Sequence, residues 1–236
     1  MRSLIVMAMF VASLASANWK EYSETRELEL AIDGISLLDI DAGAGSIEIR
    51  SDSDAPRIQV TAIIKVPNSD KDDAKKLIES NLKLTLVKTR SKASLEAYFD
   101  RGFWRSGNSA SVDLKIQVPH GLAIYVDDGS GSLRIEGVAG AVGIDDGSGS
   151  IIVTGAESVK IDDGSGSIKI SQVSGDVFVE DGSGDITIRE VGGTVTIDDG
   201  SGSINVDDVE HDLIIVDDGS GSVQFSDIRG AIHQGN

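Results

Sequence analysis

The chain has 236 residues, no cysteine, and 39 acidic against 21 basic side chains, which gives a formal net charge of −18. This excess of negative charge argues against binding to nucleic acid and to anionic lipid surfaces, and it suits cations, basic partners or solubility alone. Because no disulfide can form, stability must come from the burial of apolar side chains and from backbone hydrogen bonds.

The first 17 residues have the pattern of a signal peptide. A short basic start, Met1 and Arg2, precedes the apolar residues 4–14, and residues 15–17 (ASA) supply a small-residue cleavage site. The apolar run is too short to cross a bilayer comfortably, and no later run is long and apolar enough to anchor the mature chain. The sequence therefore predicts export with cleavage of residues 1–17. The periplasm is the leading expectation, and secretion or display at the cell surface are the alternatives.

A lead-in at residues 18–36 is followed by a region that combines strands with one helix. Residues 37–50 (LLDIDAGAGSIEIR) have the pattern of a degenerate first rung of a repeat that becomes regular later. Residues 51–118 interrupt this repeat with an expected helix at residues 70–82 and four expected strands. The strands are expected at residues 57–66, 82–89, 93–99 and 111–118. We expect this insertion to form a small α+β cap, an antiparallel sheet with one helix, over the N-terminal end of the repeat.

Residues 101–107 (RGFWRSG) concentrate aromatic and basic side chains in a chain with only 4% aromatic residues. Aromatic and arginine side chains dominate binding hot spots, so this loop is a candidate contact for a protein partner or a glycan. The alternative is that its aromatic side chains pack at the junction between cap and repeat. The candidate partner-binding residues are Arg101, Phe103, Trp104 and Arg105.

The sequence repeats itself regularly over residues 119–236. An acidic turn, DDGSGS or the variant EDGSGD, starts at residues 127, 145, 162, 180, 198 and 217, so the period is 17 to 19 residues. Each period contains two short segments of alternating apolar and polar residues, separated by turns that contain glycine. Self-similarity at a short fixed period is typical of a solenoid. The sequence therefore predicts an all-β fold, a single-stranded two-sided β-solenoid with about 18 residues per rung and a continuous aliphatic core.

The acidic turn has an expected structural role in each rung. Its glycines are expected to adopt positive φ angles and to let stacked backbones approach closely. The second acidic residue of each pair is expected to accept hydrogen bonds from N–H groups of the turn, and the first to point outward. The expected turn residues are Asp128, Gly129, Gly131, Asp146, Gly147, Gly149, Asp163, Gly164, Gly166, Asp181, Gly182, Gly184, Asp199, Gly200, Gly202, Asp218, Gly219 and Gly221.

The outward acidic residues would form a ladder, which is the strongest candidate site in the sequence. Ca²⁺ takes several oxygen ligands in flexible geometry, so adjacent carboxylates and turn carbonyls could hold it. The alternative is a solvated acidic corner, since one carboxylate per rung supplies few ligands. The candidate metal-binding residues are Asp127, Asp145, Asp162, Glu180, Asp198 and Asp217.

These motifs resemble a known bacterial family. The repeated Asp-x-Gly-Ser-Gly turns, the segment at residues 112–133 (VDLKIQVPHGLAIYVDDGSGSL) and the degenerate copy at residues 37–50 are similar to the domain-of-unknown-function family labelled "putative adhesin". The resemblance covers roughly residues 35–230 and implies a β-solenoid exported to the cell envelope. Most copies here keep serine after the second glycine, where the family often has aspartate, as at Asp185.

Known catalytic motifs are absent from the sequence, which has no cysteine nucleophile, no Gly-x-Ser-x-Gly elbow and no phosphate-binding loop. The acidic residues repeat uniformly, whereas the active site of a solenoid that cuts polysaccharides would be a local departure from the repeat. His211, within residues 210–212 (EHD), could bind a transition metal. A turn is its more typical role, because His120 and His233 lie far along the chain.

The sequence therefore favours a non-enzymatic cell-envelope protein, structural or adhesin-like, whose partner is an unknown envelope protein or glycan. The alternatives are a Ca²⁺-dependent binding module and a polysaccharide-acting enzyme. No cofactor is expected to be required. The candidate exposed face carries Tyr125, Lys160, Phe178, Thr196 and Ile215. Because the chain after Ile228 offers less than a full rung, self-association through the C-terminal edge is also an expectation.

Overall fold

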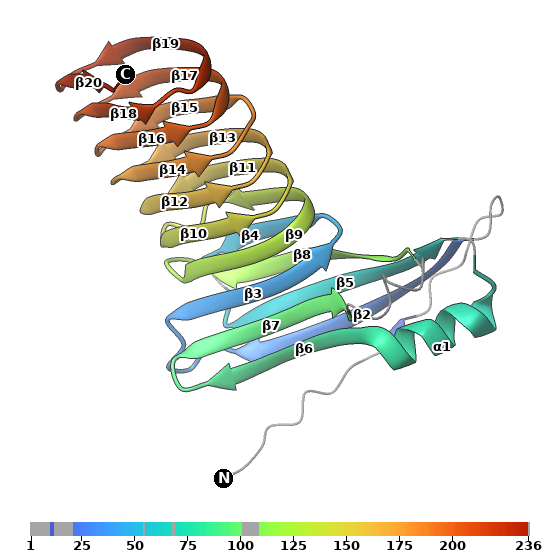
Figure 1. Cartoon of the computed structure of the whole chain (residues 1–236). Helices are drawn as coiled ribbons and strands as arrows, with labels where there is room; N and C mark the ends of the chain where they lie inside the picture. The colour runs from blue at the N-terminus through green and yellow to red at the C-terminus, as the bar shows by residue number, and fades with distance from the viewer. Residues whose placement is uncertain (1–9, 12–20, 54, 68, 101–108, 236) are drawn as a thin grey trace.

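The computed structural model describes residues 10–11, 21–53, 55–67, 69–100 and 109–235. They form a rod of stacked β-rungs that rises from a platform of longer strands with one helix (Figure 1). The rod has two sheets, here called sheet A and sheet B, and each full rung contributes one strand to each of them. The predicted β-solenoid with a small α+β cap is confirmed.

The order of strands in each sheet follows from the pairings. From the platform to the C-terminal end, sheet A consists of β2 (Glu21–Ala31), β5 (Arg57–Pro67), β8 (Ser111–Pro119), β4 (Ile47–Asp52), the second half of β9 (Ala123–Glu136), β11 (Gly149–Ala156), β13 (Gly166–Val173), β15 (Ile186–Val191), β17 (Ser201–Val209) and β19 (Ser220–Ile228). Sheet B consists of β6 (Leu82–Thr89), β7 (Lys92–Phe99), β3 (Leu37–Ala44), the first half of β9, β10 (Ala141–Asp146), β12 (Ser158–Asp163), β14 (Val177–Asp181), β16 (Val195–Asp199), β18 (Leu213–Asp217) and β20 (Ile232–Gln234). The short strand β1 (Phe10–Val11) pairs antiparallel with β2.

The platform differs from the expected antiparallel sheet in the way it joins the rod. The pairs β2–β5, β5–β8 and β6–β7 are antiparallel, but β7 is parallel to β3 and β8 is parallel to β4. The strands β7 and β8 therefore form a further rung beneath the rung of β3 and β4. The insertion interrupts the repeat in the sequence, whereas the stack of strands continues through it in space.

The single helix of the described chain, α1 (Lys71–Asn81), begins where its sequence predicts. The side chain of the N-cap residue Asp70 accepts hydrogen bonds from the backbone N–H groups of Asp72 (3.1 Å) and Asp73 (3.0 Å), which would otherwise lack a partner. Ala74 and Ile78 are buried and join the core. Among the described residues, no helix has the length and apolar character that crossing a membrane requires.

The core consists of aliphatic columns that run along the rod. Side chains at one position of successive rungs lie in register, and each is at most 1% exposed; on sheet A one such column is Leu133, Ile151, Ile168, Ile186 and Ile204. Burying each of these side chains contributes about 1.5–3 kcal/mol relative to leaving it in water. The columns give the disulfide-free chain its stability, and they hold the outward residues of each strand in fixed rows.

Ile215, which the sequence analysis places on the exposed face, is 1% exposed and belongs to the core. It pairs with Ile197, and the register between β16 and β18 shifts immediately afterwards. Val216 occupies the additional position and is 48% exposed. The expectation was wrong because this repeat is one residue longer than its neighbours, so counting back from Asp217 misplaces the strand. Ile214, paired with Thr196, takes the outward position.

Candidate functional site

The acidic corners bury one carboxylate in each of five consecutive rungs. At four of them Oδ1 of the second acidic residue accepts a hydrogen bond from the serine N–H two residues later. These bonds measure 3.2 Å at Asp146, 3.1 Å at Asp163, 3.0 Å at Asp181 and 3.0 Å at Asp199. The five side chains, including Asp128, are at most 3% exposed. This is the hydrogen bond that the turn sequence predicts, and it leads the carboxyl group into the corner rather than into solvent.

The second oxygen of these carboxyl groups, Oδ2, is buried and has no hydrogen-bond partner among the described residues. Parallel pairing sets the five side chains in one stack. Burial, together with the neighbouring carboxyl group of Asp146, raises the pKa of Asp128 to about 7. Burial, with smaller contributions from neighbouring carboxyl groups, raises the pKa of Asp163 and of Asp181 to about 6. The stack therefore holds protons at a pH where ordinary aspartates are ionised.

The two glycines of each corner have different roles. Gly149, the second of its corner, has a φ of 149°, and a Cβ on it would lie 1.6 Å from the carbonyl oxygen of Gly131 in the preceding rung. The positive φ expected for the first glycine is wrong at Gly129, Gly147, Gly164, Gly182 and Gly200. A Cβ on Gly147 would still lie 2.6 Å from the carbonyl oxygen of Gly129. The first glycine is therefore required by the close stacking of backbones and not by its φ angle.

The last corner departs from the others, because its two acidic residues exchange roles. Oδ1 of Asp217 accepts a hydrogen bond from the N–H of Gly219 (2.9 Å), whereas Oδ2 of Asp218 accepts one from Nε2 of Gln234 (3.3 Å). Gly219 has the positive φ, 43°, and Gly221 does not. The additional residue Val216 forms an irregularity just before this corner, after which Asp217 pairs with Asp198. Asp217 therefore stands in register with the ladder residue Asp198 but also caps the turn, and Asp218 does not have its expected capping role.

The outward acidic residues form a ladder on the outer surface of sheet B. Strand pairing places Asp127, Asp145, Asp162, Glu180 and Asp198 in one row, all exposed except the half-buried Asp198. Stacked strands lie about 4.8 Å apart, so neighbouring carboxylates repel one another. Partial burial and the adjacent Asp145 raise the pKa of Asp127. Within the described part of the chain, no group of three or more acidic, histidine or cysteine side chains is arranged to hold a metal ion.

A second row lies beside the ladder, two residues earlier on the same strands and therefore on the same face. It consists of Tyr125, Gly143, Lys160, Phe178 and Thr196. Tyr125 is 39% exposed, and Nζ of Lys160 lies 5.4 Å from the centre of the Phe178 ring. We call the ladder and this row together the sheet B face. The alternation of polar and apolar residues predicted four members of the row, and Gly143 was missed.

Gly143 makes the sheet B face concave. Because it has no side chain, a shallow hollow of about 470 Å³ opens between Tyr125 on one side and Lys160 and Phe178 on the other. A Cβ on Gly143 would lie 2.9 Å from Cδ2 of Tyr125, so a larger residue would displace that ring. The hollow is lined mainly by apolar atoms, and the carboxylates of the ladder flank it.

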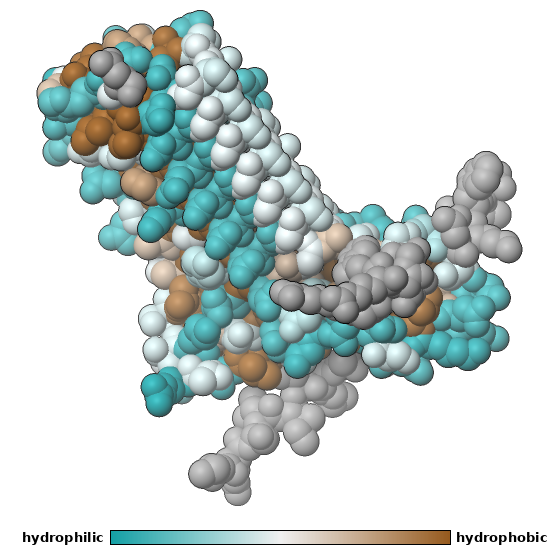
Figure 2. All heavy atoms as spheres, viewed as in Figure 1, coloured by the Kyte–Doolittle hydropathy of each residue, from teal (hydrophilic) through white to brown (hydrophobic). Residues whose placement is uncertain are grey.

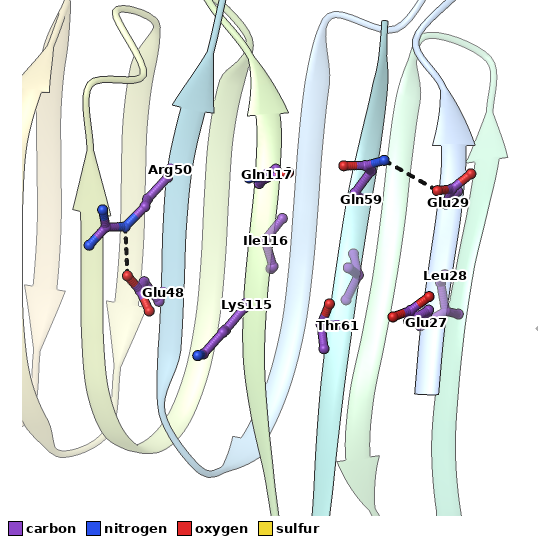
Figure 3. Close-up of a pocket in the computed structure, with 11 residues that line it drawn as sticks. Glu27, Leu28, Glu29, Glu48, Arg50, Gln59, Thr61, Lys115, Ile116 and Gln117 are labelled. Atoms are coloured by element: carbon purple, nitrogen blue, oxygen red, sulfur yellow. Dashed lines mark hydrogen bonds and ion pairs between the residues drawn. The ribbon is translucent and has the colours of Figure 1, made fainter. Parts of the chain in front are cut away.

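A different concavity, of about 420 Å³, lies on the outer surface of sheet A in the platform. Figure 3 shows its side chains rising from four adjacent strands, β4, β8, β5 and β2. Its polar side chains include pairs that satisfy one another: Arg50 with Glu48 (2.6 Å), and Gln59 with Glu29 (3.2 Å). Among the described residues Lys115 has no ion-pair partner there, so this groove offers a free cation between carboxylates and amides.

The groove is not predicted from the sequence, because residues 18–36 are expected there only as a lead-in. The alternation of Glu27, Leu28, Glu29 and Leu30 was the available signal, since it is the pattern of a strand with one buried face. One wall of the groove is formed by Glu27 and Glu29 of β2, so the groove cannot be predicted unless this strand is predicted first.

The other candidate positions do not join these sites. Arg101, Phe103, Trp104 and Arg105 lie outside the described residues, as does most of the expected signal peptide. Near His211, Glu210 pairs with Arg229, and Asp212 accepts a hydrogen bond from the N–H of Ala231 (2.8 Å). The acidic residues of this turn therefore have structural partners.

Parallel rungs, glycine corners and a strand-rich platform define the class of this protein: a two-sheet β-solenoid with an acidic corner in six successive rungs. The chain belongs to the Toastrack family, DUF4097, whose sequence model matches residues 35–230. The resemblance drawn from the acidic turns is thereby confirmed.

The chain is also similar to several crystal structures, at 12% sequence identity in each of three. One is a "putative cell adhesion protein" from Clostridium sporogenes, with a TM-score of 0.32 and coverage of 92% of this chain and 98% of that chain. Another is a "putative adhesin" from Bacteroides fragilis, with a TM-score of 0.38 and coverage of 91% and 97%. A third is a "putative lipid binding protein" from Parabacteroides distasonis, with a TM-score of 0.34 and coverage of 92% and 95%. No curated protein matches the chain.

Proposed function

We propose that this chain is a non-enzymatic binding scaffold, exported to the cell envelope, that holds a basic partner on the sheet B face. The observation that carries the proposal is the pairing of two rows on one rigid surface: a ladder of carboxylates, and beside it a row with two aromatic rings and a hollow. Export rests on the signal-peptide pattern of residues 1–17.

The ladder determines the sign of charge on the partner. Acidic side chains at the spacing of the strands create a field that attracts and orients cationic groups, most strongly at low ionic strength. Lysine or arginine side chains on the partner would relieve the repulsion between neighbouring ladder carboxylates, such as Asp145 and Asp162. A basic partner therefore gains affinity from charges that are unfavourable in the free protein.

The adjacent row supplies the apolar part of the contact. Tyr125 and Phe178 present rings to solvent on either side of Gly143, and rigid aromatic surface contributes strongly to binding at little entropic cost. The partner that fits best has apolar groups to fill the hollow and basic groups to meet the ladder.

The uniformity of the corners supports a binding role over catalysis. Acid–base catalysis requires two groups in different environments, whereas the ladder carboxylates repeat one environment from rung to rung. The buried stack is closed off from solvent, with side chains at most 3% exposed, so its raised pKa values occur where no substrate can reach.

Binding of a fluorescent lysine decapeptide, measured by anisotropy at two ionic strengths, tests the proposal. The triple variant Asp145→Asn, Asp162→Asn and Glu180→Gln is expected to weaken binding by about tenfold or more and to reduce its dependence on salt. Glu157→Gln, Glu190→Gln and Asp208→Asn together make the matched control, because these residues are exposed, lie outside the sheet B face and change the net charge equally.

The control triple is expected to change affinity by less than about threefold. Equal losses in the two triple variants would show that net charge alone attracts the peptide and would contradict the proposed face. For the apolar row, Phe178→Ser is expected to weaken a peptide of alternating lysine and tyrosine more than it weakens the lysine decapeptide.

A further inference from the structure

Within the described residues, the C-terminal end of the rod leaves the aliphatic core open. In the last rung Phe225 is 42% exposed and Ile232 is 44% exposed, whereas Val206 and Leu213, their partners in the preceding rung, are fully buried. Val216 lies at the same end and is 48% exposed. Figure 2 shows hydrophobic residues gathered at the tip of the rod, the end that β19 and β20 form in Figure 1. The core columns therefore end in solvent.

The backbone of the last rung is also open. Within the described chain, β19 pairs with β17 on one side and with no strand on the other, and β20 likewise pairs only with β18. Unpaired N–H and C=O groups in a strand of nine residues form a template for a further strand.

The two ends of the molecule differ in how their edges are protected. At the platform β2, whose outer side pairs only with the two-residue β1, carries Glu21, Glu24, Arg26, Glu27 and Glu29, and the edge strand β6 carries Lys83 and Lys88. Such charges are what natural proteins use to prevent edge pairing. From position 220 to 226 the outward residues of β19 are instead the neutral Ser220, Ser222, Gln224 and Ser226, and the charged residue of the strand is Asp227, near its end. Among the described strands, those at the C-terminal edge therefore have less of this protection than those at the platform.

We propose that two copies of this chain join tail to tail through β19, about a two-fold axis, so that sheet A and the core run from one copy into the other. The charged platform edges disfavour head-to-tail stacking, which leaves a closed dimer as the arrangement that satisfies the free edge. If β19 pairs with β19 of the second copy, two strands of nine residues lie side by side. If it paired with β20 of the second copy, the partner strand would have only three residues.

Charge at the ends of β19 agrees with this antiparallel arrangement. Asp217 and Asp218 precede the strand, and the exposed Arg229 follows it. In an antiparallel pair the start of each strand lies beside the end of the other, so Arg229 of each copy comes near the acidic corner of the other copy. The neutral middle of the strand brings no like charges together across the axis.

Analytical ultracentrifugation of the purified protein at about 0.15 M salt, where long-range repulsion between the two acidic chains is screened, tests the proposal. A concentration-dependent mass approaching twice that of the chain is expected. Gln224→Lys is expected to raise the dissociation constant by about tenfold or more, because the two lysines face each other across the axis. Asn205→Lys is the matched control, since Asn205 is exposed at the equivalent position one rung earlier and is already paired on both sides.

A second test locates the interface. Because the chain has no cysteine, Ser222→Cys, Gln224→Cys or Ser226→Cys introduces a single cysteine that reports on its own surroundings. Mild oxidation is expected to cross-link at least one of these variants about tenfold faster than Glu27→Cys on the platform edge. A monomer at all concentrations without selective cross-linking would overturn the proposal, as would a dimer that Gln224→Lys leaves intact. Both readouts are independent of peptide binding to the sheet B face.

Discussion

Asp146 and Asp163 occupy the same position in consecutive rungs, paired side by side in sheet B, and each is 2% exposed. Each has one oxygen engaged by a serine N–H and one buried oxygen without a partner among the described residues. Two ionised carboxylates in this arrangement would repel across the short distance between strands, and burial penalises the charge on both. The buried aspartate of each corner stabilises the turn through its hydrogen bond. Because it lies beside the same aspartate of the next rung, it also makes the stability of the rod depend on pH.

Stability is expected to fall as pH rises from about 5 to about 8. The folded-state pKa is about 7 for Asp128 and about 6 for Asp163 and Asp181, above the ordinary value of 3.8. Protons bind these groups more tightly in the folded than in the unfolded state. Their contribution is therefore complete below the unfolded pKa and is lost as pH rises through the folded values. Thermal unfolding followed by circular dichroism should show a melting temperature lower by about 5 °C at the higher pH.

The triple variant Asp128→Asn, Asp163→Asn and Asp181→Asn separates this effect from that of the exposed ladder. An asparagine Oδ1 still accepts the hydrogen bond of the turn but does not titrate. We expect the variant to melt at nearly the same temperature across this pH range, with its largest gain over the parent at high pH. A pH profile as steep as that of the parent would contradict the assignment to the buried stack.

Gly149→Ala is expected to destabilise the rod by more than about 3 kcal/mol, because it combines an unfavourable φ with a Cβ driven into a backbone carbonyl. The matched control is Gly137→Ala, where φ is 67° and a Cβ would meet no atom within 4 Å. That substitution is expected to cost only about 1 kcal/mol, from its φ alone. Urea unfolding of the two variants measures the difference, and equal costs would mean that close stacking does not require the glycine.

Much of the rod was predictable from the sequence because its rules are local. The alternation around Ile168 and Ile170 predicts a strand, and the Asp-Gly pairs predict the corner hydrogen bonds, so stacking copies of one rung gives the columns. The parallel return of β7 and β8 beneath the first rung was not predictable. It depends on which strands pair across long sequence separations, and the residues of a single strand do not determine its neighbour.

The errors at the candidate sites also have a physical cause. When a rung has one additional residue, the sequence does not show whether that residue lies within the strand or in the turn after it. The pairing of Ile215 with Ile197 shows that Ile215 is buried and that Val216 is the additional, exposed residue. Gly143 was missed for a related reason. It contributes to a binding surface through the side chain it lacks, and that effect appears only once Tyr125 and Phe178 are known to lie on either side.

Divalent cations are expected to have no specific effect on stability. The ladder offers one carboxylate per rung, and the described residues contain no group of three or more ligating side chains. At fixed ionic strength, the melting temperatures in EDTA, in millimolar Ca²⁺ and in millimolar Mg²⁺ should coincide. A rise with Ca²⁺ that Mg²⁺ does not reproduce, and that Asp145→Asn with Asp162→Asn abolishes, would instead make the ladder a calcium site, because a ligand of the folded state must stabilise it.

Truncating an aliphatic side chain should cost far more inside the rod than at its open end. Ile188 is fully buried in a column of sheet A, so Ile188→Ala removes its burial and leaves a cavity between rungs, at an expected cost of about 2–5 kcal/mol. Ile232 is 44% exposed, and Ile232→Ala should cost less than about 1 kcal/mol. Urea unfolding at protein concentrations below the dimer dissociation constant isolates this comparison from association. Equal costs of Ile232→Ala and Ile188→Ala under those conditions would mean that the last rung is packed in the monomer as well as the middle of the rod. That result would contradict the exposed end of the core on which the proposed dimer rests.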